Sequence, residues 1–215
     1  MSDPTTAVTR LSERQRTGRA DLDTVLDNTP LATVAFVRDG HPVALPIGFA
    51  RLGDELVIHG STGSPWLRAL AAGAQACVCV TLLDAVMVAR SGFESSFRYR
   101  SAVLFGSFAA VGDDDKDSYL RALTEVFIPG RTAEIRPSSA KELAATRVLR
   151  MAIGADNWSV KVTDGWPEDE ADDVASGVWA GVVPIETRYG APVRAPDCDP
   201  GVPTPASVRA MTSGA

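Results

Sequence analysis

A short run of small polar residues, 60–64, is the part of this sequence best suited to hold an anion. It follows a strand-like stretch, residues 55–59, and ends in Ser64 and Pro65, a serine cap and a proline typical of a helix start. Free backbone N–H groups and the positive end of a helix dipole both favour negative charge, and Arg68 adds a cation one turn later. No Gly-Lys-Ser or Gly-Lys-Thr follows, so the run is not a Walker loop. Two interpretations stay open: a phosphate cradle, or a polar turn that caps a helix.

Other residues that commonly do chemistry are sparse. The chain has two histidines, His41 and His59, and three cysteines, none of them in a Cys-x-x-Cys pair. A zinc site is therefore not expected, and no Ser/His/Asp or Cys/His arrangement for nucleophilic catalysis can be recognised. Cys77 and Cys79 are two apart in a strand-like run, so both side chains are expected on one face. The aspartates at 113–115 are interpreted as a helix start, because no downstream Gly and Glu complete a calcium loop.

The elements that must position these residues are mostly short strands. Strand patterns cover residues 31–37, 43–50, 55–59, 76–83, 85–91, 98–111, 148–153, 158–162 and 177–185. Helical patterns cover residues 19–28, 64–72, 113–127 and 140–146. Many short strands at hairpin spacing, with helices between them, are typical of an antiparallel barrel with peripheral helices. Ligands of such small barrels usually bind at a mouth or at a subunit interface.

The composition is that of an ordinary globular protein and excludes several functions. The 215 residues are 45% hydrophobic and 22% charged, with a net charge of −6. No basic stripe could neutralise nucleic-acid phosphates, so nucleic acid is not expected as a partner. No uncharged run approaches the ~20 residues of a membrane helix, and the charged N-terminus lacks the apolar stretch of a signal peptide. We expect a cytoplasmic protein with an N-terminal arm, residues 1–18, one domain, residues 19–189, and a Pro-rich tail, residues 190–215.

Five segments of the sequence, taken together, resemble one known family. They read VLDNTPLATVAFVRDGHPVALP, LVIHGSTGSPWLRALAAGA, FRYRSAVLFGSFAAV, IPGRTAEIRPSSAKELAATRVLR and, near the end, NWSVKV followed by VWAGVVPI. In this order they resemble the pyridoxamine 5′-phosphate oxidase-like superfamily of FMN-binding split barrels, in its actinobacterial branch related to nitroimidazole-resistance flavoproteins. The resemblance implies a mainly β (α+β) fold, an antiparallel split β-barrel with peripheral helices. It also implies a homodimer with two FMN sites at its interface.

The resemblance further implies which residues contact the flavin. They come from a strand whose backbone meets the pyrimidine edge, from the turn and helix start near the phosphate, and from a later strand at the dimer seam. The corresponding positions here are Leu45, Pro46, Ile47, His59, Gly60, Ser61, Ser64, Trp66, Arg68, Tyr99, Arg100, Ser101 and Lys161. Lys161 and Trp179 are expected to complete the site from the second subunit. Structural alternatives stay open for these positions, such as a core or interface aromatic, a capped histidine or a solvated lysine.

Two departures from the branch bear on the cofactor and the chemistry. Pro65 stands where the branch usually has a basic residue, which removes one cation and one backbone N–H from the phosphate cradle. Glu94 and Ser95 stand where the branch usually has a histidine pair, and Arg98 replaces an asparagine. Glu94 is either a general base near the flavin or a surface residue. The candidates for a catalytic role are Glu94, Tyr99 and Arg100.

The leading hypothesis is an FMN-dependent oxidoreductase that acts on a small molecule, with NAD(P)H as a candidate electron donor. Deazaflavin F420 in place of FMN, or no cofactor at all, stays open. A second hypothesis is a flavin- or heme-binding protein without turnover. A third is a biosynthetic enzyme of the same fold that has lost FMN and works without a redox cofactor.

Overall fold

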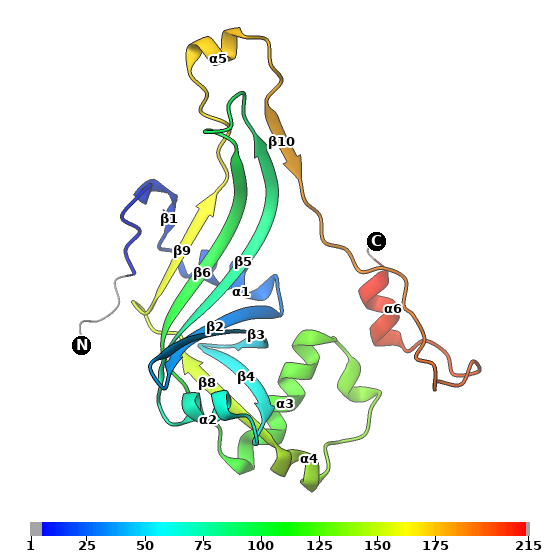
Figure 1. Ribbon diagram of the computed structural model, residues 1–215. Coiled ribbons are helices and arrows are strands. Elements are labelled where there is room, and N and C mark those ends of the chain that lie inside the picture. The colour runs from blue at the N-terminus through cyan, green and yellow to red at the C-terminus, as the bar shows by residue number, and fades with distance from the viewer. Residues whose placement is uncertain (1–5, 214–215) are drawn as a thin grey trace.

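The computed structural model describes residues 6–213, and ten strands of this part form one antiparallel sheet. The strand order is β1-β9-β6-β5-β2-β3-β4-β8-β7, and β10 pairs with β5 beside this path (Figure 1). The strands are β1 (Gln15–Arg16), β2 (Leu31–Arg38), β3 (His41–Leu52), β4 (Glu55–Ser61), β5 (Gln75–Val88), β6 (Ser96–Ser107), β7 (Ala109–Ala110), β8 (Thr146–Ala152), β9 (Trp158–Thr163) and β10 (Gly181–Pro184). The sheet is not closed, and the predicted antiparallel split barrel is confirmed.

Six α-helices and two 3-10 turns surround the sheet in the described part of the chain. The helices are α1 (Arg19–Asp27), α2 (Pro65–Ala71), α3 (Asp113–Phe127), α4 (Ala140–Ala145), α5 (Ala171–Ala175) and α6 (Ala206–Thr212), and the turns are η1 (Ser12–Arg14) and η2 (Arg131–Ala133). Among these residues, none of the helices combines the length and the apolar character needed to cross a membrane.

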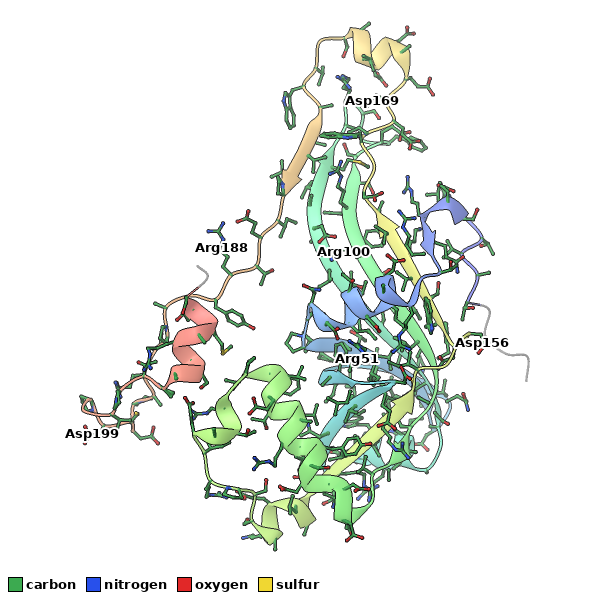
Figure 2. The ribbon with its side chains drawn as sticks, turned by 180° about the vertical axis from the view of Figure 1, so that it is seen from behind. Arg51, Arg100, Asp156, Asp169, Arg188 and Asp199 are labelled. Carbon is green, nitrogen blue, oxygen red and sulfur yellow. The ribbon has the colours of Figure 1, made fainter. Side chains whose placement is uncertain are left out.

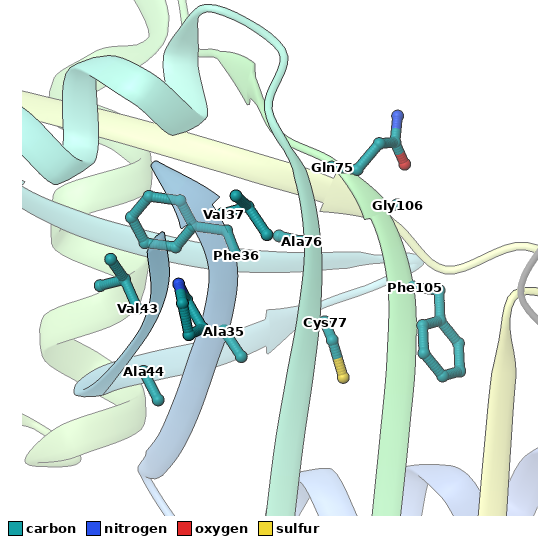
Figure 3. A pocket seen from close by; sticks show the side chains of 11 residues that line it. Ala35, Phe36, Val37, Val43, Ala44, Gln75, Ala76, Cys77, Phe105 and Gly106 are labelled. Carbon is teal, nitrogen blue, oxygen red and sulfur yellow. The ribbon is translucent and has the colours of Figure 1, made fainter. Parts of the chain in front are cut away.

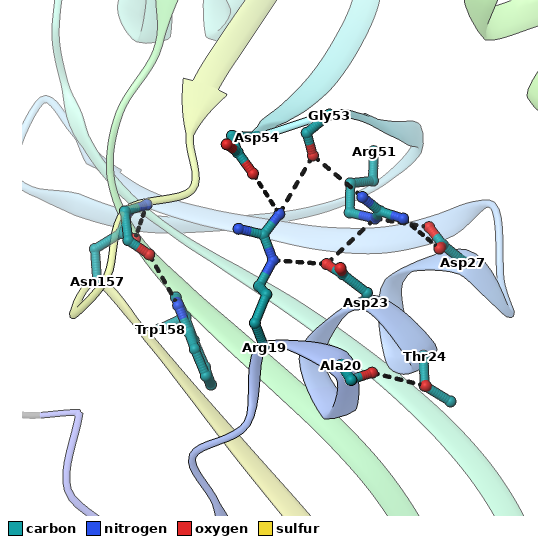
Figure 4. A network of polar contacts seen from close by, with 11 residues as sticks. Arg19, Ala20, Asp23, Thr24, Asp27, Arg51, Gly53, Asp54, Asn157 and Trp158 are labelled. Carbon is teal, nitrogen blue, oxygen red and sulfur yellow. Dashed lines mark hydrogen bonds and ion pairs between the residues drawn. The ribbon is translucent and has the colours of Figure 1, made fainter.

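The main core lies on the inner face of the sheet, under α1. Leu22, Val25 and Leu26 of α1 are buried at helical spacing, as the sequence pattern predicts. They pack with alternate strand residues such as Val34 and Val78, which are fully buried. A polar network fixes the same helix to the β3–β4 turn: Arg19 lies 2.7 Å from Asp23 and 2.7 Å from Asp54 (Figure 4).

A second, smaller cluster lies on the opposite, outer face of the sheet, where α3 covers β3, β4 and β8. It contains Ala50 of β3, Val57 of β4, Val148 of β8 and Leu123 of α3. The helix occupies residues 113–127, as predicted, and its acidic first turn suits the helix dipole. Because α3 ends at Phe127, it leaves the outer face of β2, β5 and β6 uncovered by a helix.

The structure differs from the sequence-based expectation at the middle of β5. Residues 76–83 and 85–91 were expected as two strands, but Gln75–Val88 is one strand with a bulge between Leu83 and Ala85. The bulge accommodates Asp84, whose carboxylate accepts hydrogen bonds from Arg100 on β6. Asp84, the acidic residue between the two apolar runs, therefore marks a bulge within β5 and not the end of a strand.

Beyond the barrel, β5 and β6 continue as a long ribbon, and the chain returns from its tip along a C-terminal arm (Figure 1). The arm begins with β10, which is shorter than the strand expected over residues 177–185. It ends in α6, which sequence patterns did not predict, as they did not predict α5. The α6 start is held by Glu134 of the chain after η2, which accepts a hydrogen bond from the Ser207 N–H at 3.0 Å.

Candidate functional site

Strand β3 has an unpaired edge along most of its length. Its residues 41–48 pair with β2, whereas β4 pairs only with residues 49–52. The Phe49 N–H donates to the Pro30 carbonyl at 2.9 Å, which fixes the alternation of the ladder. Odd-numbered residues of β3 direct their backbone groups at β2, and even-numbered ones direct them at the open edge. The Ala44 N–H and carbonyl and the Pro46 carbonyl therefore face this edge.

The two prolines of β3 are explained by the same geometry. Pro42 and Pro46 are opposite Val37 and Thr33 of β2 in pairs that exchange no hydrogen bonds. A missing N–H at these two positions costs no ladder bond, so proline is tolerated inside the strand. Ala44, between them, is the residue of this stretch whose outward N–H is retained.

Beside the open edge, the outer face of the sheet forms a low surface of small side chains, which we call the outer platform. One row across the strands is Ala44, Ala35, Cys77 and Phe105, and the next is Pro46, Thr33, Cys79 and Val103. Residues directly opposite in neighbouring strands share a face, so each row lies on one side of the sheet. Cys77 and Cys79 lie on the same face, as predicted, and both are half-buried free thiols.

A cavity of about 550 Å³ opens over the outer platform (Figure 3). Its floor includes Ala35, Ala44 and Cys77, and Phe105 and Gln75 stand at its side. Burial raises the pKa of the Cys77 thiol, so this thiol is protonated and behaves as a small apolar group. A flat, largely apolar surface next to unpaired backbone groups can receive a planar ring with polar atoms on one edge.

The structure brings some of the sequence-predicted residues to this face and directs others away. Strand alternation puts Pro46, Ser101 and Tyr99 on the outer face, with Lys161 directly opposite Ser101. The corresponding side chains of Leu45 and Ile47 pack against the main core, and their backbone groups face β2. Of Leu45, Pro46 and Ile47, Pro46 alone directs a backbone group at the open edge of β3, and Ala44, which is not among the predicted residues, directs two.

Arg100 lies on the other face of β6 from its neighbours Tyr99 and Ser101. Its guanidinium donates to both carboxylate oxygens of Asp84, at 2.9 and 2.7 Å. This bidentate pair raises the pKa of Arg100. Glu94 is half-buried in the β5–β6 loop, where its N–H donates to the Ser91 hydroxyl. The three catalytic candidates therefore do not form one cluster.

The 60–64 segment forms a closed turn. The Thr62 N–H donates to the Ala145 carbonyl at 2.9 Å, and the Gly63 and Ser64 N–H groups donate to the Ser61 hydroxyl and carbonyl at 3.2 and 3.0 Å. Ser64 occupies the cap position of α2, but its side chain makes no capping bond. Pro65 has no N–H to offer. Of the two interpretations open from the sequence, the geometry favours the polar turn.

Trp66 and Arg68 follow this turn on α2. The Trp66 ring is partly buried against the main core and reaches to 3.9 Å from where a side chain on Gly60 would begin. Gly60 therefore leaves room for the Trp66 and Leu67 side chains. Arg68 is exposed and is the one cation of residues 60–70.

His59 lies on the outer face of β4, at the end of α3. Its ring is half-buried, with its centroid 6.4 Å from that of Phe127. The Nδ1 atom is buried and has no hydrogen-bond partner. Burial lowers the pKa of His59 below its usual 6.5, so the imidazole is neutral at pH 7. Within residues 6–213, no three His, Cys, Asp or Glu side chains are arranged to hold a metal ion.

A second hollow runs between the barrel and the C-terminal arm, and sequence analysis did not find it. A cavity of about 760 Å³ is bounded by Thr29, Leu83, Arg100 and Arg188 among others. Figure 2 labels Arg100, on the ribbon, and Arg188, on the arm. It shares Asn28, Thr29, Pro30 and Tyr189 with a cavity of about 320 Å³ that reaches Phe127. No local pattern could have indicated this hollow, because the arm residues that bound it are about 100 positions from the strands they face.

Comparisons with known proteins bear on this site. A family model described as pyridoxamine 5′-phosphate oxidase matches residues 18–159. A structure described as the FAD and heme binding protein from Mycobacterium smegmatis is 67% identical, covering 93% of this chain and 97% of that one, with a TM-score of 0.91. The flavocytochrome Anf3 from Azotobacter vinelandii is 34% identical, covering 96% of this chain and 95% of that one, with a TM-score of 0.89. No curated protein matches the chain.

Proposed function

Because the chain belongs to the pyridoxamine 5′-phosphate oxidase family, we propose that it is a flavin-binding oxidoreductase that also carries heme. The two similar structures, at 67% and 34% identity over nearly the whole chain, are described as a FAD and heme binding protein and as a flavocytochrome. Both descriptions support a flavin together with heme. Turnover of a small molecule is part of the proposal, and a flavin- and heme-binding protein without turnover is its alternative.

The observation that carries flavin binding is the open edge of β3 next to the outer platform. The pyrimidine edge of a flavin has carbonyl acceptors and an N–H donor. The Ala44 N–H and the Ala44 and Pro46 carbonyls are the complementary groups, and no β4 residue pairs with them. The small side chains of Ala35, Cys77 and Cys79 leave a flat surface for the ring.

The closed turn at 60–64 favours FAD over FMN. FMN ends in a phosphate that carries close to two negative charges, which needs several free donors or cations. Here the Thr62, Gly63 and Ser64 N–H groups all have partners in the chain, and Pro65 has no N–H. Arg68 is the one cation of residues 60–70, and Arg147 lies opposite Gly60 on β8. In FAD the phosphates are bridged and each carries about one charge, so the demand on this turn is smaller. The expected FMN is therefore replaced by FAD in the proposal.

A bound flavin supplies the redox chemistry, and the chain's own residues bind it, orient it and limit water access. The outer platform offers few groups for proton transfer: Tyr99 and Lys161 are the titratable oxygen and nitrogen side chains that share its face near Ser101. Substrate protonation would therefore involve Tyr99, Lys161 or solvent. The Arg100–Asp84 pair is on the other face and holds the β5 bulge.

A homodimer remains part of the proposal. Large apolar side chains continue along the outer face from the barrel into the ribbon and are 47–63% exposed: Leu31, Val37, Leu83, Phe97 and Val183. A continuous apolar face of this kind is typical of an interface. A second copy that covered it would also shield a flavin at the open edge of β3 from water.

The test is to purify the protein and identify what it carries. We expect the absorption spectrum to show flavin bands in the blue part of the visible range together with a heme Soret band. Chromatography of the denatured protein should show that the released flavin is FAD and not FMN. Reduced nicotinamide should then bleach the flavin bands if the protein turns over. A colourless protein that takes up neither flavin nor hemin would contradict the proposal, and release of FMN would contradict the choice of FAD.

A further inference from the structure

The 760 Å³ hollow beside the C-terminal arm lies at a gap in the sheet, along the side of β5 that pairs with β2 and β10. β2 pairs with residues 76–79 of β5, and β10 pairs with residues 85–88. Between these two pairings, Thr81 and Leu83 of β5 line the hollow, and the loop at residues 28–30 and the arm form its other walls. The hollow therefore exists because two strands end short of each other along β5.

The hollow and the outer platform lie along one face of β5. Cys77, Cys79 and Thr81 are alternate residues of this strand, so their side chains share the outer face. Cys77 lines the 550 Å³ cavity, and Thr81 lines the hollow. At the usual rise of a strand, the Cα atoms of these two residues are about 13 Å apart. One ligand that occupies both cavities must therefore carry two groups joined by a linker of that length.

The lining of the hollow combines an aromatic ring, hydroxyl groups and a cation that can change partners. Tyr189 is 57% exposed and borders both the hollow and the 320 Å³ cavity, so its ring can stack on a base. Arg188 pairs with Glu186, but their side chains are 67% and 63% exposed, and such a surface pair contributes little stability. The Arg188 guanidinium can therefore turn to a phosphate. Thr29 and Thr187 add hydroxyls that donate or accept hydrogen bonds.

Two other arginines at these cavities are fixed in the walls. The Arg100 guanidinium donates to both carboxylate oxygens of Asp84, and Arg51 donates to both carboxylate oxygens of Asp27. Arg188 is the cation of the lining that such a carboxylate does not hold on both sides. One cation with uncharged hydroxyls suits two bridged phosphates that carry about one charge each. A terminal phosphate with close to two charges needs more cations than this lining offers.

We propose that the hollow binds the adenosine diphosphate half of FAD, and this inference rests on the flavin binding proposed for the outer platform. The linker between the flavin ring and the adenine then follows the outer face of β5 from Cys77 to Thr81. FMN ends at its first phosphate and leaves the hollow empty. The arm becomes part of the cofactor site, and it is anchored before the hollow by the Ile185 N–H, which donates to the Asp84 carbonyl at 2.9 Å.

The experiment titrates purified, flavin-free protein with FAD and with FMN and follows flavin fluorescence. Tyr189→Ala removes the aromatic ring and should weaken FAD binding about tenfold, a usual effect of losing one stacked base. FMN, which has no adenine, should bind to this variant within about twofold of wild type. Tyr189→Phe keeps the ring and is the matched control. For wild type, ADP should compete with FAD and not with FMN.

Charge reversal on the arm tests the contact with the phosphates. Arg188→Glu should weaken FAD binding by about tenfold or more and leave FMN binding unchanged, because like charges repel. The control is Arg10→Glu, at an exposed arginine that precedes η1, near the edge of the sheet formed by β1. FAD should also protect the peptide bond after Arg188 from trypsin, and FMN should not. This protection is a readout that depends neither on fluorescence nor on turnover.

The failure of the inference and the failure of the proposed function give different results. If both variants weaken FAD and FMN alike, or if both bind FAD as wild type does, the hollow does not hold the adenosine diphosphate half, and flavin binding at the platform stands. Equal affinity of wild type for FAD and FMN has the same meaning. If wild type binds neither flavin, the proposed function fails and the inference fails with it. Retained FMN binding shows that a variant is folded.

Discussion

The closed turn at residues 60–64 and the open edge of β3 are both stretches of backbone beside a strand, yet only the edge has unused hydrogen-bonding groups. In the turn, the N–H groups of Thr62, Gly63 and Ser64 each have a partner within the chain. At the edge, Ala44 and Pro46 direct their backbone groups away from β2, at a position that β4 does not reach. A Gly/Ser-rich composition is therefore a poorer guide to a ligand site than the end of a ladder.

The largest effect is expected from filling the space over the outer platform. Ala35→Arg would put a long cation into the 550 Å³ cavity, and a charge buried against a flat apolar ring is strongly unfavourable. Flavin affinity should fall by roughly a hundredfold or more, about 3 kcal/mol. Fluorescence titration of the apoprotein with FAD measures it.

The matched control for this substitution is Ala152→Arg, at an exposed alanine of β8 outside the platform. It should bind FAD as wild type does. If Ala35→Arg also binds FAD with unchanged affinity while remaining folded, the flavin ring does not lie on the outer platform, and the open edge of β3 is not where the flavin binds.

A smaller effect on flavin affinity is expected from adding a cation and a backbone N–H to the closed turn. Pro65→Lys adds a cation and an N–H at the start of α2, where negative charge is favoured by about 0.3–1 kcal/mol. The affinity for FMN should rise about two- to fivefold relative to that for FAD. Pro65→Ala, which adds the N–H without the charge, separates the two contributions. An unchanged FMN-to-FAD ratio in both variants would show that neither phosphate approaches this turn.

The turn itself should matter for stability and not for the flavin. Ser61→Ala removes the hydroxyl that accepts the Gly63 N–H at 3.2 Å. The free energy of unfolding should fall by about 0.5–1.5 kcal/mol, the usual contribution of one hydrogen bond, while FAD affinity stays within about twofold. Urea unfolding and FAD titration of the same sample distinguish these outcomes. A large loss of FAD affinity without loss of stability would show that the turn is part of the flavin site.

The smallest effect is a pH dependence from His59, at the border of the outer platform. Its pKa in the folded chain is depressed by burial below the usual 6.5, so the unfolded chain takes up a proton that the folded chain does not. Stability of the heme-free protein should therefore be lost as the pH falls below about 6.5, the pKa of an unfolded-chain histidine. His59→Gln should reduce this loss. Equal pH dependence of the two urea midpoints would mean that His59 is not the group responsible.

The family, the split barrel and several elements could be predicted from the sequence. Helix α3 covers the predicted residues 113–127, because its apolar spacing and acidic first turn are local signals. The common face of Cys77 and Cys79 follows from strand alternation alone. The same alternation separates Arg100 from Tyr99 and Ser101, so their division between two faces could have been anticipated.

Other features depend on partners far away in the sequence. The β5 bulge is held by Asp84 with Arg100, 16 positions later, so a local pattern reads it as a strand end. The open edge of β3 exists because β4 pairs with β3 only as far as Ile58, while it pairs with β8 along its whole length to Ser61. No feature of residues 41–48 indicates this separation. Helix α6 depends on Glu134, 73 positions before Ser207. The flavin-contacting role of the thirteen predicted residues stays a prediction.

The most direct test of flavin binding at the open edge is the FAD affinity of Ala44→Pro. Proline already occupies the equivalent positions 42 and 46, so the substitution removes the outward N–H without breaking a ladder bond. Ala44→Gly, which keeps the N–H, is the control. Loss of one hydrogen bond predicts about five- to tenfold weaker FAD binding in Ala44→Pro and none of that loss in Ala44→Gly. Wild-type affinity in a folded Ala44→Pro variant would contradict the assignment of the flavin to this edge.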